Sequence, residues 1–234
     1  MATKAVQHGT VSAKLMDRDC DTDETASGKF VRVLYFVFSI LVLMRWTVSA
    51  VQAKQTTSDN FIRVLYASGR SAEIPESADA YGWLVGSWEL EVLHYRGIDL
   101  SSQNIKGEAH FNWVLEGRAI QDVWIMPRIS GRKSDSDRTN NMYGTTLRVW
   151  DPAIQAWRIR WINPVSGHEE RQTGRKVGGE IVQVGARADG TPTRWRFTEV
   201  TPDTFHWIGE ALEPDGRTWK IEGEFRAHRL HQTW

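Results

Sequence analysis

Apolar and polar side chains alternate with a period of two through most of the chain after residue 81. In residues 157–161, two indoles and an isoleucine share one face of an extended chain and two arginines share the other. Residues 194–197 and 219–226 repeat this arrangement. A period of two is typical of β-strands, because successive side chains point to opposite faces. The region is therefore predicted to be all-β.

Turn residues divide this region into a series of strands. Pairs such as Gly178-Gly179 and Asp189-Gly190 supply the positive φ angles that tight hairpins require. The pattern predicts ten strands, at residues 88–96, 107–115, 119–126, 142–150, 157–163, 168–177, 181–188, 193–200, 204–212 and 219–230. An open meander of this size would expose two edges. We therefore expect it to close into an antiparallel up-and-down β-barrel with an interior cavity.

Four regions are expected along the chain. Residues 1–28 are polar and lack apolar periodicity, so they are predicted to be disordered. Residues 29–53 contain an almost wholly apolar run of 12 residues, 33–44. Residues 54–80 are rich in Ser, Ala and Asp and are interpreted as a linker. Residues 81–234 form the expected barrel domain.

The apolar run leaves three alternatives open. Its length suits the central part of a secretion signal better than a membrane-spanning helix, which needs about 20 residues. Small residues around Ala53 also fit a signal-peptidase site. The alternatives are an uncleaved membrane anchor with Arg45 near its middle, or a buried hydrophobic segment. We expect a protein that is exported to the periplasm or the extracellular space or is anchored in a membrane, and a cytoplasmic one if translation starts after residue 53.

Composition adds a tryptophan-rich core to this picture. The chain has 12 tryptophans, 11 of them from Trp83 onward. Each buried indole removes a large apolar area from water, so the core needs no disulfide. The single cysteine, Cys20, lies outside the expected barrel. The 29 basic and 29 acidic residues balance, which argues against a nucleic acid partner.

Strand alternation does not decide which face of the barrel points inward. In one arrangement the aromatic face fills the interior and the charged face meets solvent. In the other, a few paired charges also point into the cavity near its mouth and hold the polar end of a ligand. In both, the expected ligand-binding residues are Trp124, Trp161, Trp195 and Trp207.

Four mid-strand residues are candidates for acid–base chemistry. His110 and Asp122 are expected to face each other across a hairpin, where Asp122 would orient the imidazole as a base. His206 and Glu210 form the second candidate pair. No metal site is expected, because the adjacent residues of 168–170 point to opposite faces of a strand. Nucleophile and phosphate-loop motifs are also missing from the sequence.

The start and the end of the barrel region resemble a known family. Gly86-Ser87-Trp88 at the first strand and Arg226 on the last resemble the lipocalin-like calycin barrels, in which a late arginine covers a Gly-x-Trp indole. This resemblance, closest to bacterial lipocalin-like barrels of unassigned function, implies that Gly86, Trp88 and Arg226 plug one barrel end. Any ligand should then enter from the opposite mouth.

A more distant resemblance to nitrobindin raises the question of a haem cofactor. Nitrobindin-like proteins bind haem through a histidine near the C-terminus, and His228 or His231 is the comparable position here. Arginines crowd both histidines, and no neighbouring motif follows the family pattern. No cofactor is therefore expected.

Together these patterns favour a binding module for a small hydrophobic or amphipathic molecule. The first alternative is an enzyme on the same barrel that uses one of the acid–base pairs on a hydrophobic substrate. The second is a structural or partner-binding domain whose core is filled. Binding is favoured over catalysis, because predominantly apolar walls with a few polar groups are typical of ligand pockets.

Overall fold

The computed structural model describes residues 59–132 and 141–231. The predicted disordered segment 1–28 and the predicted signal or anchor 29–53 lie outside these residues. Among the described helices, none is both long and apolar enough to cross a membrane.

Strands make up most of the described chain. They are β1 (Gly86–Tyr95), β2 (Ile98–Asp99), β3 (Lys106–Val114), β4 (Ala119–Met126), β5 (Met142–Asp151), β6 (Ala156–Asn163), β7 (His168–Val177), β8 (Glu180–Ala186), β9 (Pro192–Thr198), β10 (Thr204–Leu212) and β11 (Trp219–Arg229). Short 3₁₀ turns occur at η1 (Glu76–Ala78), η2 (Gly82–Leu84), η3 (Ser101–Gln103) and η4 (Ile129–Gly131). One α-helical segment spans residues 59–65.

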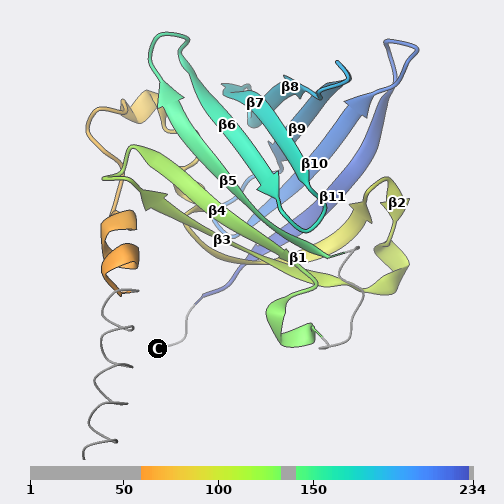
Figure 1. Cartoon of the computed structure of the whole chain (residues 1–234), viewed down its shortest axis with the longest axis horizontal. Coiled ribbons are helices and arrows are strands. Elements are labelled where there is room, and N and C mark those ends of the chain that lie inside the picture. Colours follow the sequence, from red (N-terminus) through yellow and green to blue (C-terminus); the bar gives the residue numbers. More distant parts are fainter. Residues whose placement is uncertain (1–58, 133–140, 232–234) are drawn as a thin grey trace, which may run out of the picture. The chain divides into compact units, whose positions relative to one another are not determined.

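The long strands form a closed antiparallel barrel of ten strands (Figure 1). From β3 to β11, each strand pairs with the next one along the chain, and β1 pairs with both β3 and β11. The two-residue β2 adds only to the edge of β1 and was not expected. Each of the ten expected strands overlaps one barrel strand, so the all-β, up-and-down prediction is confirmed. The architecture is consistent with a calycin-like fold.

The aromatic face of the strands points into the barrel. On β6, Trp157, Ile159 and Trp161 are buried, whereas Arg158 and Arg160 are exposed. Every second residue of a strand therefore contributes to the core, as a period of two requires. The charged face meets solvent over most of the sheet.

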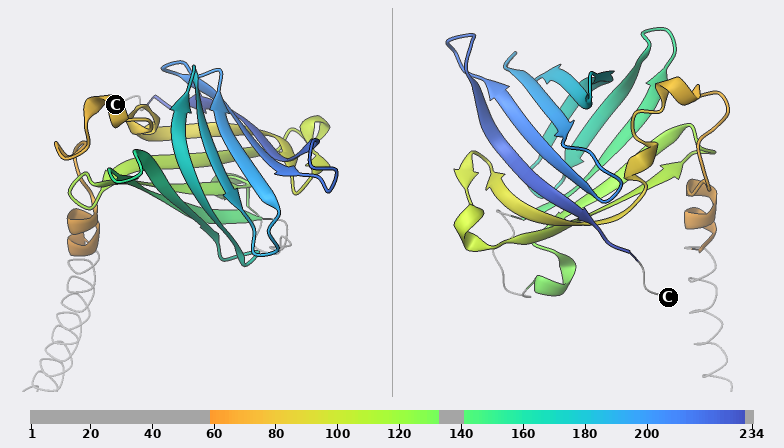
Figure 2. Two further views of the ribbon diagram at one scale, coloured as in Figure 1. Left: turned by 90° about the horizontal axis from the view of Figure 1, so that it is seen from above. Right: turned by 180° about the vertical axis from the view of Figure 1, so that it is seen from behind.

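The segment before β1 packs across one end of the barrel (Figure 2, orange). Tyr66 forms a β-bridge with Val114. Further along, Ile74 and Tyr81 are buried in the core, and the Trp157 indole donates a hydrogen bond of 2.8 Å to the Ala78 carbonyl. The later part of the segment expected as a linker thus contributes to the packing of the domain.

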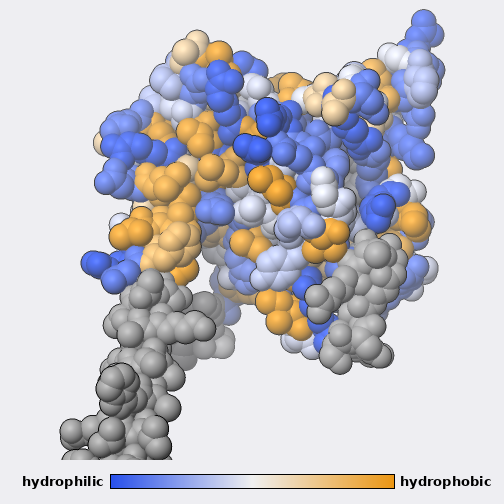
Figure 3. Space-filling view, viewed as in Figure 1, coloured by the Kyte–Doolittle hydropathy of each residue, from blue (hydrophilic) through white to orange (hydrophobic). Residues whose placement is uncertain are grey.

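Apolar side chains also gather on the outside of the α-helical segment at residues 59–65 (Figure 3). Phe61, Ile62, Val64 and Tyr66 are all more than half exposed. Because none of them lines the cavity described below, this patch is separate from the barrel interior.

Candidate functional site

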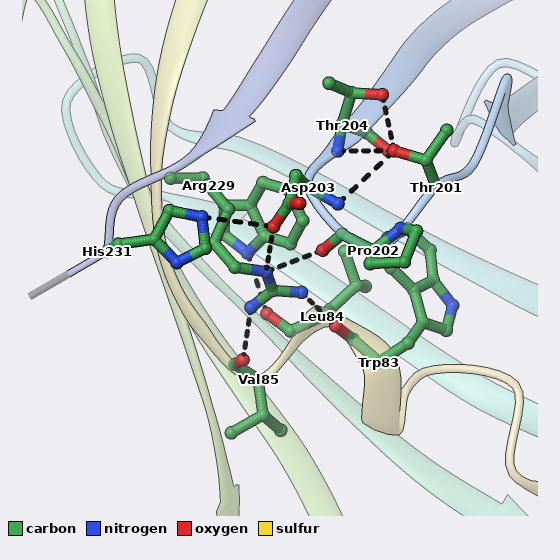
Figure 4. Close-up of polar contacts among 10 residues, drawn as sticks. Trp83, Leu84, Val85, Thr201, Pro202, Asp203, Thr204, Arg229 and His231 are labelled. Carbon is green, nitrogen blue, oxygen red and sulfur yellow. Dashed lines mark hydrogen bonds and ion pairs between the residues drawn. The ribbon is translucent and has the colours of Figure 1, made fainter.

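One end of the barrel is closed around the Trp88 indole, which is fully buried. The Arg229 guanidinium lies 4.1 Å from the centre of this ring. It also donates hydrogen bonds to the carbonyls of Trp83 (2.6 Å), Val85 (2.8 Å) and Pro202 (2.7 Å) (Figure 4). A guanidinium that stacks on an aromatic ring and has its N–H groups hydrogen-bonded is held firmly in place. Ligand entry at this end is therefore blocked.

The arginine of this plug is Arg229, and the expectation of Arg226 was wrong. Arg226 lies on the outer face, where it donates a hydrogen bond of 3.0 Å to Glu199. Gly86 has a φ of +129°, and a Cβ there would lie 2.9 Å from the Arg229 Nη1. Glycine at this position thus leaves room for the guanidinium over Trp88.

A cavity of about 590 Å³ lies toward the opposite end of the barrel. Its aromatic lining residues are Trp124, Trp161, Trp195, Trp207 and Phe225. Its polar lining residues include Tyr95, Arg96, Thr146, Arg148, Asn163, Ser166, His168, Arg187 and Glu222. All four tryptophans expected from the sequence therefore face this space, and it lies away from the Trp88 plug, as expected.

The aromatic lining is one continuous wall. Ring centroids are 6.4 Å apart between Trp161 and Trp195, and 5.4 Å apart between Trp195 and Trp207. Phe225 continues the wall, at 5.4 Å from Trp207 and 5.7 Å from Trp124. Tilted and edge-on pairs at such spacings hold each other in place. The wall offers a ligand a rigid apolar surface.

A buried ion pair lies beside this wall. The Arg148 Nη1 donates to the Asp122 Oδ2, and both side chains are almost inaccessible to solvent. The Thr146 backbone N–H donates to the other Asp122 oxygen at 2.7 Å. Arg148 also stacks on the Tyr81 ring, 5.1 Å from its centre, while burial raises the pKa of the Tyr81 phenol. Asp122 is fully engaged by these partners and therefore serves the interior structure.

A second charged group lies near the mouth of the cavity. Arg187 donates through Nη2 to the Glu222 Oε2, and its Nε lies 3.5 Å from the Glu170 Oε1. The His168 Nε2 lies 3.7 Å from the same oxygen. Burial raises the pKa of the Glu170 carboxyl, whereas burial and the Arg187 charge lower the pKa of His168. The mouth therefore combines polar groups with the apolar wall.

The structure does not bring His110 and Asp122 together, so the expectation that they face each other was wrong. In the β3–β4 register, Phe111 lies opposite Asp122, and His110 lies opposite Val123. His110 is on the outer face, with its Nδ1 2.9 Å from the Ser87 Oγ. The two side chains point to opposite sides of the sheet and cannot share a proton.

His206 and Glu210 also lie on the outer face, in separate networks. The His206 Nε2 is 2.9 Å from the Glu224 Oε1. Glu210 accepts hydrogen bonds from Arg194 (2.9 Å) and Arg196 (3.2 Å). Both residues satisfy partners on the barrel wall, and neither reaches the cavity.

The two histidines considered for haem ligation lie outside the cavity as well. His228 is exposed, and His231 pairs with Asp203 at 3.2 Å near the plugged end. Within the residues that the structure describes, no three His, Cys, Asp or Glu side chains cluster in a way that could hold a metal ion.

Arg148 and Arg187 of the cavity were not expected from the sequence. Glu222 belongs to the charged face of residues 219–226, from which a few paired charges were expected to point into the cavity. Arg148 follows Thr146 at a spacing of two and so shares its face, but the other face of β5 is the more apolar one. Arg187 follows β8, and Glu222 lies where the register of β10 and β11 is interrupted. Outside a strand or at a bulge, the alternation of side chains does not indicate which face a residue occupies.

No protein-family model matches this chain, and no curated protein matches it in sequence. Since a barrel of this kind is compatible with many activities, function has to be inferred from the cavity itself.

Proposed function

We propose that the barrel binds a small apolar or amphipathic molecule inside this cavity. The observation that carries the proposal is a space of about 590 Å³ with a continuous aromatic wall and polar groups near its mouth. Ligand pockets typically measure roughly 300–1,000 Å³ and combine apolar walls with a few polar groups. An apolar body would pack on the indoles, and a polar end would remain near His168 and Arg187.

The same geometry argues against the two alternatives. The acid–base candidates are either on the outer face or, in the case of Asp122, bound to Arg148. A filled core is at odds with an open space lined by Trp195 and Trp207, which are only partly buried. Binding is the function that these residues support best.

Native mass spectrometry of the purified protein, together with its absorption spectrum, tests the proposal directly. A co-purified small molecule of defined mass would support it. A Soret band would instead identify haem and replace the apolar ligand that we propose.

Blocking the mouth should weaken binding of an uncharged apolar fluorescent probe such as N-phenyl-1-naphthylamine. Ser166 lines the cavity, whereas its neighbour Val165 does not. We therefore expect Ser166→Trp to lower probe affinity about tenfold, as the loss of one well-packed contact would, and Val165→Trp to leave it unchanged. Equal affinities for both variants would contradict a ligand site at this mouth.

A further inference from the structure

The indole N–H groups of the barrel differ in their partners. Three of them, at the plugged end, donate to backbone carbonyls: Trp83 to Ala80 (2.9 Å), Trp88 to Leu84 (2.7 Å) and Trp157 to Ala78 (2.8 Å). Buried indoles usually find such a partner, because an unpaired N–H away from water costs free energy.

The four indoles of the cavity wall differ from these. Trp124, Trp161, Trp195 and Trp207 make no hydrogen bond to any described residue. The Trp150 Nε1 is a buried atom without a hydrogen-bond partner, whereas none of the four indole nitrogens is buried in this way. These four N–H groups are therefore accessible, and the space that their rings line is the cavity.

Arg148 lines the same cavity but adds no donor that a ligand can reach. Its side chain is about 98% buried, and its Nε is a buried atom without a hydrogen-bond partner. Arg and Trp side chains can donate hydrogen bonds but cannot accept them. The lining also holds acceptor oxygens, but Asn163 already accepts a hydrogen bond from the Val165 N–H, and Glu222 accepts one from Arg187. The four indoles therefore give the cavity wall an excess of donors.

We propose that the ligand is an uncharged molecule with a flat or apolar body and hydrogen-bond acceptors, such as a ketone, quinone, ester or ether oxygen. This inference rests on the proposed function, since it specifies the chemistry of the molecule bound in the same cavity. The oxygens of the ligand accept hydrogen bonds from the indole N–H groups, while its apolar body packs on the indole rings.

An uncharged acceptor fits better than a carboxylate. The charge of Arg148 is already compensated by Asp122, so an anion in the deep cavity would find no unpaired cation. Burying a charge without a counter-charge costs far more than burying a neutral carbonyl that gains hydrogen bonds.

Three compounds of nearly the same shape test the inference: fluorene, fluorenone and fluorene-9-carboxylate. Their affinities for the full chain are measured by equilibrium dialysis. We expect fluorenone to bind roughly five- to tenfold more tightly than fluorene, as one or two added hydrogen bonds would give. The carboxylate should bind more weakly than fluorenone.

Single Trp→Phe substitutions at 124, 161, 195 and 207 locate the donor, because they keep an aromatic ring and remove the N–H. At least one of them should lower the affinity for fluorenone several-fold with little effect on fluorene. Trp219→Phe is the matched control, since Trp219 stacks under Arg194, 4.3 Å from its guanidinium, and does not line the cavity. It should change neither affinity.

The outcomes separate this inference from the proposed function. Equal affinities for fluorene and fluorenone, or a preference that survives in all four variants, would overturn the acceptor chemistry and leave binding intact. Tighter binding of the carboxylate would overturn the preference for an uncharged ligand. Failure of all three compounds to bind would contradict the proposed function and, with it, this inference.

Discussion

At the scale of single residues, Arg229 is the side chain on which closure of the plugged end depends most. Its position follows from alternation on β11, because Phe225, Ala227 and Arg229 share one face while Arg226 belongs to the other. The β1–β11 register places Arg229 beside Trp88. A period of two counted from Phe225 would thus have identified the correct arginine from the sequence.

Arg229→Ala should lower the free energy of unfolding by about 2–4 kcal/mol, because it removes the stacking on Trp88 and leaves carbonyls without donors. Arg226→Ala removes one exposed ion pair and should cost less than about 1 kcal/mol. Urea denaturation followed by tryptophan fluorescence compares the two. Similar losses for both variants would show that Arg229 is not a structural plug.

At the scale of elements, the sequence predicted where the strands lie better than which face of each strand is inside. Turn residues and alternation are local signals and mark all ten barrel strands. On β5, however, Leu147 and Val149 are more apolar than Thr146 and Arg148, yet the latter two point inward. The reason lies on another strand, where Asp122 of β4 pairs with Arg148.

The same limit applies to β8. Val182 and Val184 point away from the interior, while Gln183 is fully buried inside. The Tyr81 hydroxyl lies 3.3 Å from the Gln183 Oε1. The Gln183 Oε1 thus has a partner distant in the sequence, although the Gln183 Nε2 is buried without one. A local pattern contains no information about such partners.

The wall of the cavity depends on a glycine of β5. A Cβ at Gly144 would lie 2.4 Å from the Trp161 Cη2 and 2.7 Å from the Ile162 carbonyl oxygen. We expect Gly144→Ala to displace the indole and to cost about 1–3 kcal/mol, as overpacking of a core does.

The matched control is Gly179→Ala in the β7–β8 turn, where no atom lies within 4 Å of the added Cβ. Its stability should stay within about 0.5 kcal/mol of the unsubstituted protein. Chemical denaturation measures both variants, and an unchanged midpoint for Gly144→Ala would argue against the tight contact with Trp161.

At the scale of the whole molecule, the closed barrel encloses ionisable groups, so titration of one of them affects global stability. Glu170 is almost inaccessible to solvent, and burial raises the pKa of its carboxyl above the ordinary value of 4.5, although the nearby Arg187 acts in the opposite direction. The folded state therefore holds this proton more tightly than the unfolded state. The resulting stabilisation is present below the ordinary pKa and is lost as the pH rises through the raised value.

Glutamine carries no titratable proton, so Glu170→Gln should not lose stability in this way as the pH rises. The stability of Glu170→Gln relative to the unsubstituted protein should therefore increase between about pH 4 and about pH 7. Its neighbour Glu169 is the control. Hydrogen bonds from Arg171 and Arg160 lower the pKa of Glu169, so Glu169→Gln should lose stability relative to the unsubstituted protein as the pH rises towards 4.5 and should change little at higher pH. Urea denaturation between about pH 3 and about pH 7 measures both, and a relative stability of Glu170→Gln that does not change with pH would contradict a raised pKa.

The pairing of β1 with β11 also sets the order in which the molecule can assemble. The first barrel strand completes its hydrogen bonds only when it pairs with the last one. The Val85 carbonyl likewise accepts its hydrogen bond from Arg229, 144 residues further along the chain. During synthesis, one edge of β1 therefore stays without a partner until nearly the whole domain has left the ribosome. Contacts this distant in the sequence make folding slow, and the nascent chain is open to wrong strand pairings for all of that time.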